Sequence, residues 1–227
     1  MRGTLEPVPA LERLPLFPLA NVVLFPRVQT PLHIFEPRYR QLTGHALAGD
    51  RRIGMLAIRP EHVESIAGDP PLFAVGCEGV IRDAQQLPDG RFNIMLEGTQ
   101  RFRIVRESAR DAGRLYRVAE IEKLEDAFDP AARPRVIALR QRAIELIAEL
   151  TGEQGGRPAL TPEAFRDVDD VTFVNALSNA FPLAPAEKQS LLEAASIPER
   201  YERLVSTLGF LAAARRHLAA PPSDAIH

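Results

Sequence analysis

The chain has 227 residues, of which 45% are hydrophobic and 26% are charged, and its formal net charge is −2 at pH 7. This composition is typical of a globular protein and excludes a disordered or fibrous one, and the charge provides no global field that would attract nucleic acid or an anionic membrane. The single cysteine, Cys77, excludes an internal disulfide and a multi-cysteine metal site, so we expect a cytoplasmic protein.

We expect no targeting or membrane signal in the N-terminal region. The apolar stretch 14–25 is interrupted by Pro15, Pro18 and Asn21, and no basic region with a cleavage site precedes it, so we expect neither a signal peptide nor a membrane span. Residues 1–10 contain two prolines and little apolar content. We predict that they form a flexible leader and that residues 221–227 form a disordered tail.

Short β-type segments follow the leader. The runs 21–24 and 32–35 alternate with Pro18, Pro26 and Pro31, which suit strand ends and sheet edges. We therefore predict several short, bent strands between residues 14 and 35.

A helix is predicted to follow at Glu36-Pro37, because proline is tolerated at the first helical position. Tyr39, Leu42 and Ala46 recur on one face of this helix, and Gly49-Asp50 ends it.

The next part of the chain predicts an antiparallel β region. Its strands are expected where the sequence is apolar or alternating, at residues 53–58, 72–81, 92–96, 102–105 and 115–121. Gly76, Gly79 and Gly98 interrupt these strands, and isolated glycines in strands mark bulges or tight bends. We therefore expect a small barrel rather than a flat sheet.

Helical periodicity dominates the second half. An acidic run at residues 120–129 predicts a hinge, and Asp129-Pro130 is a cap followed by a helix-opening proline. A loop is predicted at 153–160, and helices are predicted at residues 136–150, from 161 onward, and at 169–181, 186–195 and 198–218. The sequence thus indicates an α+β protein with a β-rich subdomain at 11–126 and a helical subdomain at 127–220.

We find no pattern that indicates catalysis. A nucleotide-hydrolysing loop needs glycines followed by a lysine, and neither Lys123 nor Lys188 lies in such a loop. Ser190 stands two residues from Lys188 in a predicted helix, so their side chains point apart and a Ser/Lys dyad is not favoured. We predict no catalytic residue and no cofactor.

Metal binding is not predicted either. The nearest approach to a cluster, Glu61, His62 and Glu64, is more typical of a solvated loop. The carboxylates at a predicted helix start are interpreted as capping groups; they are Asp167, Asp169 and Asp170.

Two further features have competing interpretations. Cys77 lies in an apolar strand, which favours an inert core thiol over a nucleophile, although a small-molecule hydrolase using Cys77 or His33 is kept as an alternative. Arg101, Arg103 and Arg106 alternate with apolar residues and would suit RNA phosphates, but nearby carboxylates favour cross-strand ion pairs.

Three segments resemble one known family. The sequences LPLFPLANVVLFPRVQ and PLHIFEPRYR, then VGCEGVIRDAQQLPDGRFNIMLEGTQRFRI, then FPLAPAEKQSLLEAASIPERYERL, are similar to the N-terminal, substrate-binding domain of Lon-type ATP-dependent proteases. Such domains also occur alone and in cereblon-like proteins. The resemblance spans Leu11 to Leu218 and implies a PUA-like β-pseudobarrel followed by a helical bundle, in agreement with the strands and helices predicted above.

The resemblance also implies a function without catalysis, because we find no ATPase or Ser-Lys protease segment. We expect a protein- or peptide-binding module, acting as an adaptor or a holdase, whose partners are unfolded or degradation-prone polypeptides and an ATP-dependent protease. The candidate substrate contacts, wherever they are exposed, are Phe17, Leu24, Phe25 and Phe35. The family-motif residues are expected to be structural; they are Pro31, Leu32, His33, Glu36, Pro37, Arg38, Tyr39, Glu187, Lys188 and Gln189. The alternative is an RNA-binding PUA-like module, although nucleic acid is not the expected partner.

Overall fold

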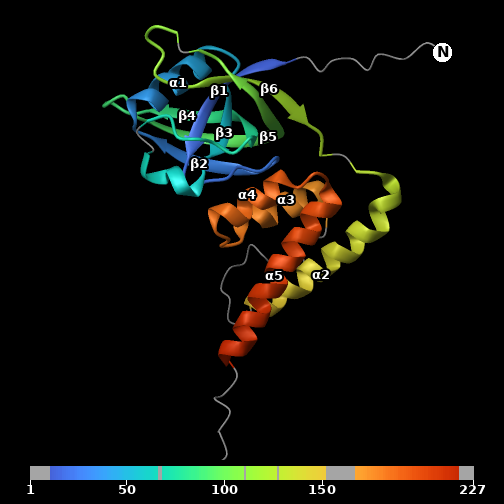
Figure 1. Ribbon diagram of the computed structural model, residues 1–227. Coiled ribbons are helices and arrows are strands. Elements are labelled where there is room, and N and C mark those ends of the chain that lie inside the picture. Colours follow the sequence, from blue (N-terminus) through green and yellow to red (C-terminus); the bar gives the residue numbers. More distant parts are fainter. Residues whose placement is uncertain (1–10, 66–67, 110, 127, 152–166, 220–227) are drawn as a thin grey trace, which may run out of the picture. The chain divides into compact units, whose positions relative to one another are not determined.

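The computed structural model describes residues 11–65, 68–109, 111–126, 128–151 and 167–219 (Figure 1). Contacts between Cα atoms divide the chain into two compact units, which are Met1–Asp126 with Asn179–Glu193, and Ala127–Ser178 with Ala194–His227. The second stretch of the first unit contains helix α4 (Pro185–Glu193), which lies within the helical subdomain predicted from sequence. The division into subdomains at residue 126 stays a prediction.

The first unit is built on one six-stranded sheet. Its strands are β1 (Glu12–Leu19), β2 (Gln29–Ile34), β3 (Arg52–Ala57), β4 (Val75–Gln86), β5 (Phe92–Glu107) and β6 (Val118–Leu124). The order is β2-β5-β4-β3-β1-β6, and β5 also pairs with β6. Strands β5, β4, β3, β1 and β6 therefore form a closed ring, which confirms the predicted barrel, while β2 remains an edge strand.

The length of β5 makes this closure possible. Its first part, Phe92 to Glu97, pairs with β2, and its second part, Arg101 to Glu107, pairs with β6. The segments 92–96 and 102–105 that the sequence suggested as separate strands are thus one strand of 16 residues. The β4–β5 ladder shifts register beside Gly79 and after Ile81, where bulges bend the sheet as predicted.

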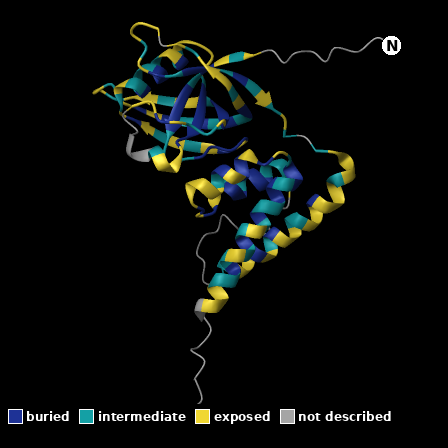
Figure 2. Ribbon diagram, in the orientation of Figure 1, coloured by how far each residue is buried: buried dark blue, intermediate teal, exposed yellow. Residues whose placement is uncertain are grey.

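The barrel interior is filled by a core centred on Phe102. This side chain is fully buried and packs in a cluster with Leu14, Leu16, Leu56, Ala119 and Ile121. Gly54 and Gly76 face it, and a Cβ atom on Gly54 would lie 2.9 Å from the Phe102 ring. Figure 2 shows buried residues mixed with intermediate and exposed ones along the strands of the ring. The two glycines therefore leave the room that the ring occupies.

The antiparallel pairing predicted for residues 53–121 is confirmed, because β3 pairs antiparallel with β4, β4 with β5, and β5 with β6. Strand β1, which precedes this region, pairs parallel with β3, with Leu16 opposite Gly54. One expectation about the strands is wrong. Residues 21–24 form no strand. Val23 and Leu24 are instead buried in an irregular segment, because their apolar side chains are needed in the core whatever the backbone conformation.

Helix α1 (Pro37–Ala48) follows β2 and begins and ends as predicted. Pro37 occupies the first helical position, and Gly49 is the C-cap. The buried face of α1 consists of Tyr39, Leu42, Thr43 and Ala46. The short 3₁₀ helix η1 (Pro60–Ser65) follows β3.

The described part of the second unit contains the 3₁₀ turn η2 (Pro130–Ala132) and the helices α2 (Arg133–Thr151), α3 (Asp170–Ala180) and α5 (Ile197–Ala219). The last two residues of α3 are assigned to the first unit. Asp129 caps η2, and Asp169 accepts hydrogen bonds from the backbone of Val171 and Thr172, so the predicted capping role is confirmed for Asp169. The predicted leader, loop, tail and helix start at residue 161 lie outside the described residues.

Helices α2 and α5 run side by side in the same direction. Arg135 near the start of α2 pairs with Glu202 near the start of α5, and Glu149 near the end of α2 pairs with Arg216 near the end of α5. None of the helices in the described ranges is long and apolar enough to cross a membrane.

Candidate functional site

The four apolar residues proposed as substrate contacts differ in exposure. Phe17, Leu24 and Phe25 are at most 4% exposed and belong to the core, whereas Phe35 is 60% exposed. Of these four residues, Phe35 is therefore the one whose side chain is exposed enough to contact a substrate. Its role in substrate binding stays a prediction.

Phe35 directly follows the edge strand β2. The ring of His33 stacks on Phe35 with centroids 6.2 Å apart, and His33 Nδ1 lies 2.7 Å from Asn93 Oδ1 on β5. Pro31 lies in the middle of β2, where an edge strand tolerates the missing N–H. Together His33 and Phe35 form a small exposed aromatic surface.

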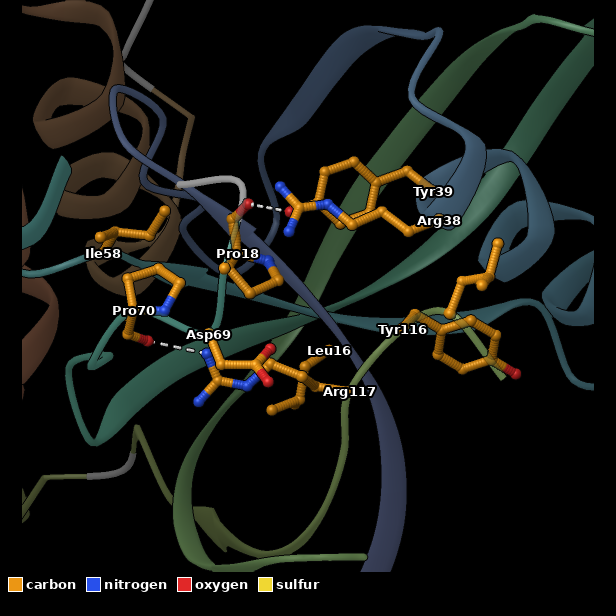
Figure 3. Close-up of a pocket in the computed structure, with 11 residues that line it drawn as sticks. Leu16, Pro18, Arg38, Tyr39, Ile58, Asp69, Pro70, Tyr116 and Arg117 are labelled. Atoms are coloured by element: carbon orange, nitrogen blue, oxygen red, sulfur yellow. Dashed lines mark hydrogen bonds between the residues drawn. The ribbon is translucent and has the colours of Figure 1, made fainter. Parts of the chain in front are cut away.

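Another motif residue of this segment, Tyr39, fastens α1 to the barrel, and its neighbour Arg38 packs on it. Tyr39 donates a hydrogen bond of 2.7 Å to the carbonyl oxygen of Pro18, and Arg38 lies over the Tyr39 ring, 4.5 Å from its centroid (Figure 3). Arg38 Nε also donates to Glu36 at 2.9 Å. Burial raises the pKa of Tyr39 to about 12. These residues therefore have clear structural contacts.

A small cavity adjoins Tyr39 and is also lined by Leu16, Asp69 and Arg117 (Figure 3). Its volume is about 10 Å³, which is at the lower limit for one water molecule. It is a packed junction rather than a binding site.

Of the three motif residues of α4, Gln189 bonds to the barrel, whereas Glu187 and Lys188 bond to the chain just before the helix. Glu187 accepts a hydrogen bond of 2.7 Å from the backbone N–H of Ala184, which caps the helix start. Lys188 Nζ donates to the carbonyl oxygen of Asn179 at 2.5 Å, and burial lowers the pKa of Lys188. Gln189 is 1% exposed and donates to the carbonyl oxygen of Val75 on β4 at 3.0 Å.

The N-terminal end of α4 forms one wall of an apolar depression of about 220 Å³, which we call the α4 hollow. Four segments of the first unit line it, and their lining residues are Ala20, Asn21, Ala57, Ile58, Pro60, Phe73, Ala184, Pro185 and Ala186. Backbone hydrogen bonds fix the segments around β3: Ile58 N–H donates to Leu19, and Phe73 N–H donates to Ala57, both at 3.0 Å.

The lining determines what the hollow can bind. Among the described residues that line it there is no ionisable side chain, and Asn21 is the single polar one. An apolar protein cavity of about 150 Å³ accommodates benzene, so a hollow of about 220 Å³ has room for one large aromatic or aliphatic side chain. The described lining is suited to apolar binding.

Sequence reasoning missed the hollow for a physical reason. Alanine and proline carry no chemical signal, and the lining residues come from positions as far apart as Ala20 and Ala186. The capping pattern at α4 could have located the start of the helix, but it could not have shown that this end of the helix lines a hollow.

The residues considered for other chemistry have structural roles. Cys77 is buried, which confirms the core interpretation. Arg106 donates to both carboxylate oxygens of Glu120, its cross-strand partner on β6, at 2.9 and 2.8 Å. Arg101 is 2% exposed and pairs with Asp126, so it is not available to RNA phosphates.

The described residues contain no group of three or more His, Cys, Asp or Glu side chains arranged to hold a metal ion.

Comparisons with known proteins agree with this architecture. A family model described as the ATP-dependent protease La (LON) substrate-binding domain matches residues 13–209. The Lon protease of Flavobacterium johnsoniae is 27% identical over 199 residues, covering 87% of this chain, and the Lon protease of Escherichia coli K12 is 28% identical and covers 86%. The chain spans 24% of the length of each of these two relatives.

Solved structures show the same fold. The crystal structure of a Lon N-terminal domain protein from Xanthomonas campestris is 27% identical, with a TM-score of 0.57, and the match covers 86% of this chain and 98% of that one. The N-terminal domain of the Mycobacterium avium complex Lon protease has a TM-score of 0.67 at 16% identity, over 87% and 98% of the two chains. The chain belongs to the family of LON substrate-binding domains.

Proposed function

We propose that this chain is a non-catalytic, cytoplasmic module that binds exposed apolar side chains of unfolded polypeptides in the α4 hollow. The observation that carries the proposal is the hollow itself, an open apolar depression of about 220 Å³ whose lining, as far as the structure describes it, includes no ionisable residue. Membership in a family of substrate-binding domains supports the same role.

The size of the hollow limits the affinity that it can supply. Burial of one Phe or Leu side chain contributes about 1.5–3 kcal/mol, whereas a millimolar dissociation constant already requires about 4 kcal/mol. A client must therefore make further contacts, and the exposed Phe35 is the candidate for one of them. Weak individual contacts suit a module that captures and releases many different unfolded segments.

The test is to fill the hollow from its own wall. Ala186 is exposed near the start of α4, so Ala186→Trp places an indole at the hollow with little cost to the core. The matched control is Ala138→Trp, at an exposed alanine of α2 in the second unit. Binding is measured by the fluorescence anisotropy of a fluorescein-labelled polypeptide that is reduced and carboxymethylated so that it stays unfolded.

We expect micromolar binding by the wild type that persists at high salt, at least about fivefold weaker binding by Ala186→Trp, and unchanged binding by Ala138→Trp. Circular dichroism of both variants checks that they are folded. Wild-type protein that binds no unfolded polypeptide in the micromolar range, or an Ala186→Trp variant that binds as well as the wild type, would contradict the proposal.

The proposed module acts as a holdase or as an adaptor. A holdase would suppress light scattering from a heated client without any other protein. An adaptor would in addition bind an ATP-dependent protease, and Ala186→Trp would then lose the client but keep the protease. A module that neither suppresses the light scattering nor binds a protease would be limited to client binding.

The geometry does not favour the RNA-binding alternative. Arg101 is buried and Arg106 is engaged by Glu120, so two of the three arginines of the strip are committed to ion pairs. RNA binding through phosphates would weaken steeply as salt rises. We expect the binding of the unfolded polypeptide to lack this dependence.

A further inference from the structure

We propose that helix α4 is a releasable wall of the hollow, fastened by Arg101, so that occupation of the hollow and the order of α4 stabilise each other. The inference rests on the proposed function for the identity of the occupant. Its anchoring step rests on contacts within the first unit.

The position of α4 in the chain is unusual. Ala184, Pro185 and Ala186 at its N-terminal end line the hollow. The chain enters the first unit at Asn179, just before α4, and leaves it again after Glu193, at its end. The wall therefore belongs to a short stretch of chain, residues 179–193, that is preceded and followed by residues of the second unit.

Helix α4 depends on attachments for its stability. It has nine residues, and an isolated helix of this length is not stable in water. Leu191 and Leu192 are buried, and Gln189 donates to the backbone of β4, as described above. Lys188 holds the incoming chain at Asn179. Loss of one strong attachment should therefore affect the whole helix.

The strongest attachment is made by Arg101 on β5. Its Nη1 donates to the carbonyl oxygen of Leu192 at 2.9 Å, at the C-terminal end of α4, where a cation also stabilises the helix dipole. Its Nε donates to Asp126 Oδ1 at 2.7 Å, and its Nη2 donates to the carbonyl oxygen of Glu125 at 3.3 Å.

One buried guanidinium thus holds two points at which the chain passes between the units. Asp126 is the last residue of the first stretch of the first unit, and Leu192 lies next to the last residue of its second stretch. Lysine cannot reproduce these contacts, because a guanidinium directs its donors in a fixed planar fork and an ammonium does not.

The functional consequence follows from linkage. A client side chain in the hollow contacts the first turn of α4 and so adds an attachment at the end opposite to Arg101. If the occupant stabilises the attached helix, the attached helix must stabilise the occupant by the same factor. Release of α4 removes three of the lining residues and opens the hollow.

The experiment is hydrogen–deuterium exchange with mass spectrometry on the full chain, comparing the wild type with Arg101→Lys and Arg82→Lys. Arg82 forms an exposed cross-strand pair with Glu97 and is the control for an arginine–carboxylate pair without a link to α4. We expect exchange in residues 186–193 to rise at least about tenfold in Arg101→Lys, with β3 unchanged and with no effect of Arg82→Lys. Equal α4 exchange in the wild type and Arg101→Lys would overturn the anchor.

Lys188→Met is a second variant, which keeps the proposal testable if Arg101→Lys unfolds globally. It keeps the apolar stem of Lys188 and removes the hydrogen bond to Asn179, so faster exchange confined to α4 is again expected. Exchange that rises equally in β3 for both variants would show global destabilisation and would overturn the proposal of a separate wall.

The second arm adds the fluorescein-labelled unfolded polypeptide. We expect it to slow α4 exchange severalfold in the wild type and in Arg101→Lys, because an occupant of the hollow binds the attached helix and not the released one. Client binding without any change in α4 exchange would overturn the coupling while the proposed function stands. If no client binds, the proposed function fails together with the coupling, and faster exchange in Arg101→Lys would establish the anchor alone.

Discussion

The hydroxyl of Tyr39 on α1 donates a hydrogen bond of 2.7 Å to the carbonyl oxygen of Pro18 on β1, and both groups are buried. Tyr39→Phe keeps the ring and leaves the carbonyl without this partner, which costs about 1–2 kcal/mol of the free energy of unfolding. Urea denaturation followed by circular dichroism measures this loss. An unchanged denaturation midpoint would show that the hydrogen bond contributes nothing to stability.

The same hydroxyl predicts a dependence of stability on alkaline pH. Burial raises the pKa of Tyr39 from the ordinary value of 10.0 to about 12 in the folded protein. Between these values the unfolded chain has lost the proton and the folded chain keeps it, so the free energy of unfolding falls as the pH rises. The contribution is fully present below pH 10 and is lost through pH 12.

Tyr39→Phe should therefore reduce the loss of stability between pH 10 and pH 12. The wild type should lose up to about 2–3 kcal/mol more than the variant over this range. The comparison must be differential, because burial also raises the pKa of Tyr201. Parallel stability curves for the two proteins would refute the assignment to Tyr39.

An ion pair on the barrel provides a second prediction. Glu78 on β4 has a side chain that is 8% exposed and accepts hydrogen bonds of 3.0 and 2.6 Å from Arg52 on β3. Arg52→Met removes the cation and leaves the buried Glu78 carboxylate with a hydrogen bond from Thr99. We expect this change to lower the free energy of unfolding by about 3 kcal/mol.

Glu78→Gln should cost less, about 1 kcal/mol, because the amide still accepts from the guanidinium and Arg52 keeps its bond to Glu12. The exposed pair of Arg82 and Glu97 provides the control, and Arg82→Met should change the thermal midpoint little. Similar midpoints for Arg52→Met and Arg82→Met would argue against a buried charge at Glu78.

Two glycines should respond in opposite directions to alanine. A Cβ atom on Gly98 would overlap the backbone carbonyl of Phe25, so Gly98→Ala must displace the main chain and should cost several kcal/mol, at least about 3. Gly44 lies within α1 with no atom near a built Cβ, so Gly44→Ala should stabilise the protein by about 0.5–1 kcal/mol. Thermal midpoints that shift in the same direction would contradict this reading of the backbone.

These residues show which features could be predicted from sequence. The limits of α1 were predicted because Pro37 and Gly49 act on the backbone locally. The parallel pairing of β1 with β3 was missed, because a strand's partner depends on the path of the whole chain. The sequence interpretation also treated Arg101 like Arg103 and Arg106, as a partner for cross-strand ion pairs, although its side chain is buried and bonds to Leu192, 91 residues away. A solvated and a buried arginine have the same local pattern in a strand.

The exposed aromatic ring after β2 is the last testable feature. Phe35 is 60% exposed, so Phe35→Ser should change the free energy of unfolding by less than about 0.5 kcal/mol. If Phe35 contacts clients as proposed, the variant should bind the labelled unfolded polypeptide about three- to tenfold more weakly, because the lost apolar burial is worth about 1 kcal/mol.

The matched control for Phe35 is Phe210→Ser on α5 in the second unit, where the side chain is 73% exposed. Equal losses for both variants would indicate that clients respond to any exposed aromatic ring. A loss for Phe35→Ser alone would place the client on the barrel beside β2, and it should then add to the effect of Ala186→Trp, since separate contact sites contribute independently to the binding free energy.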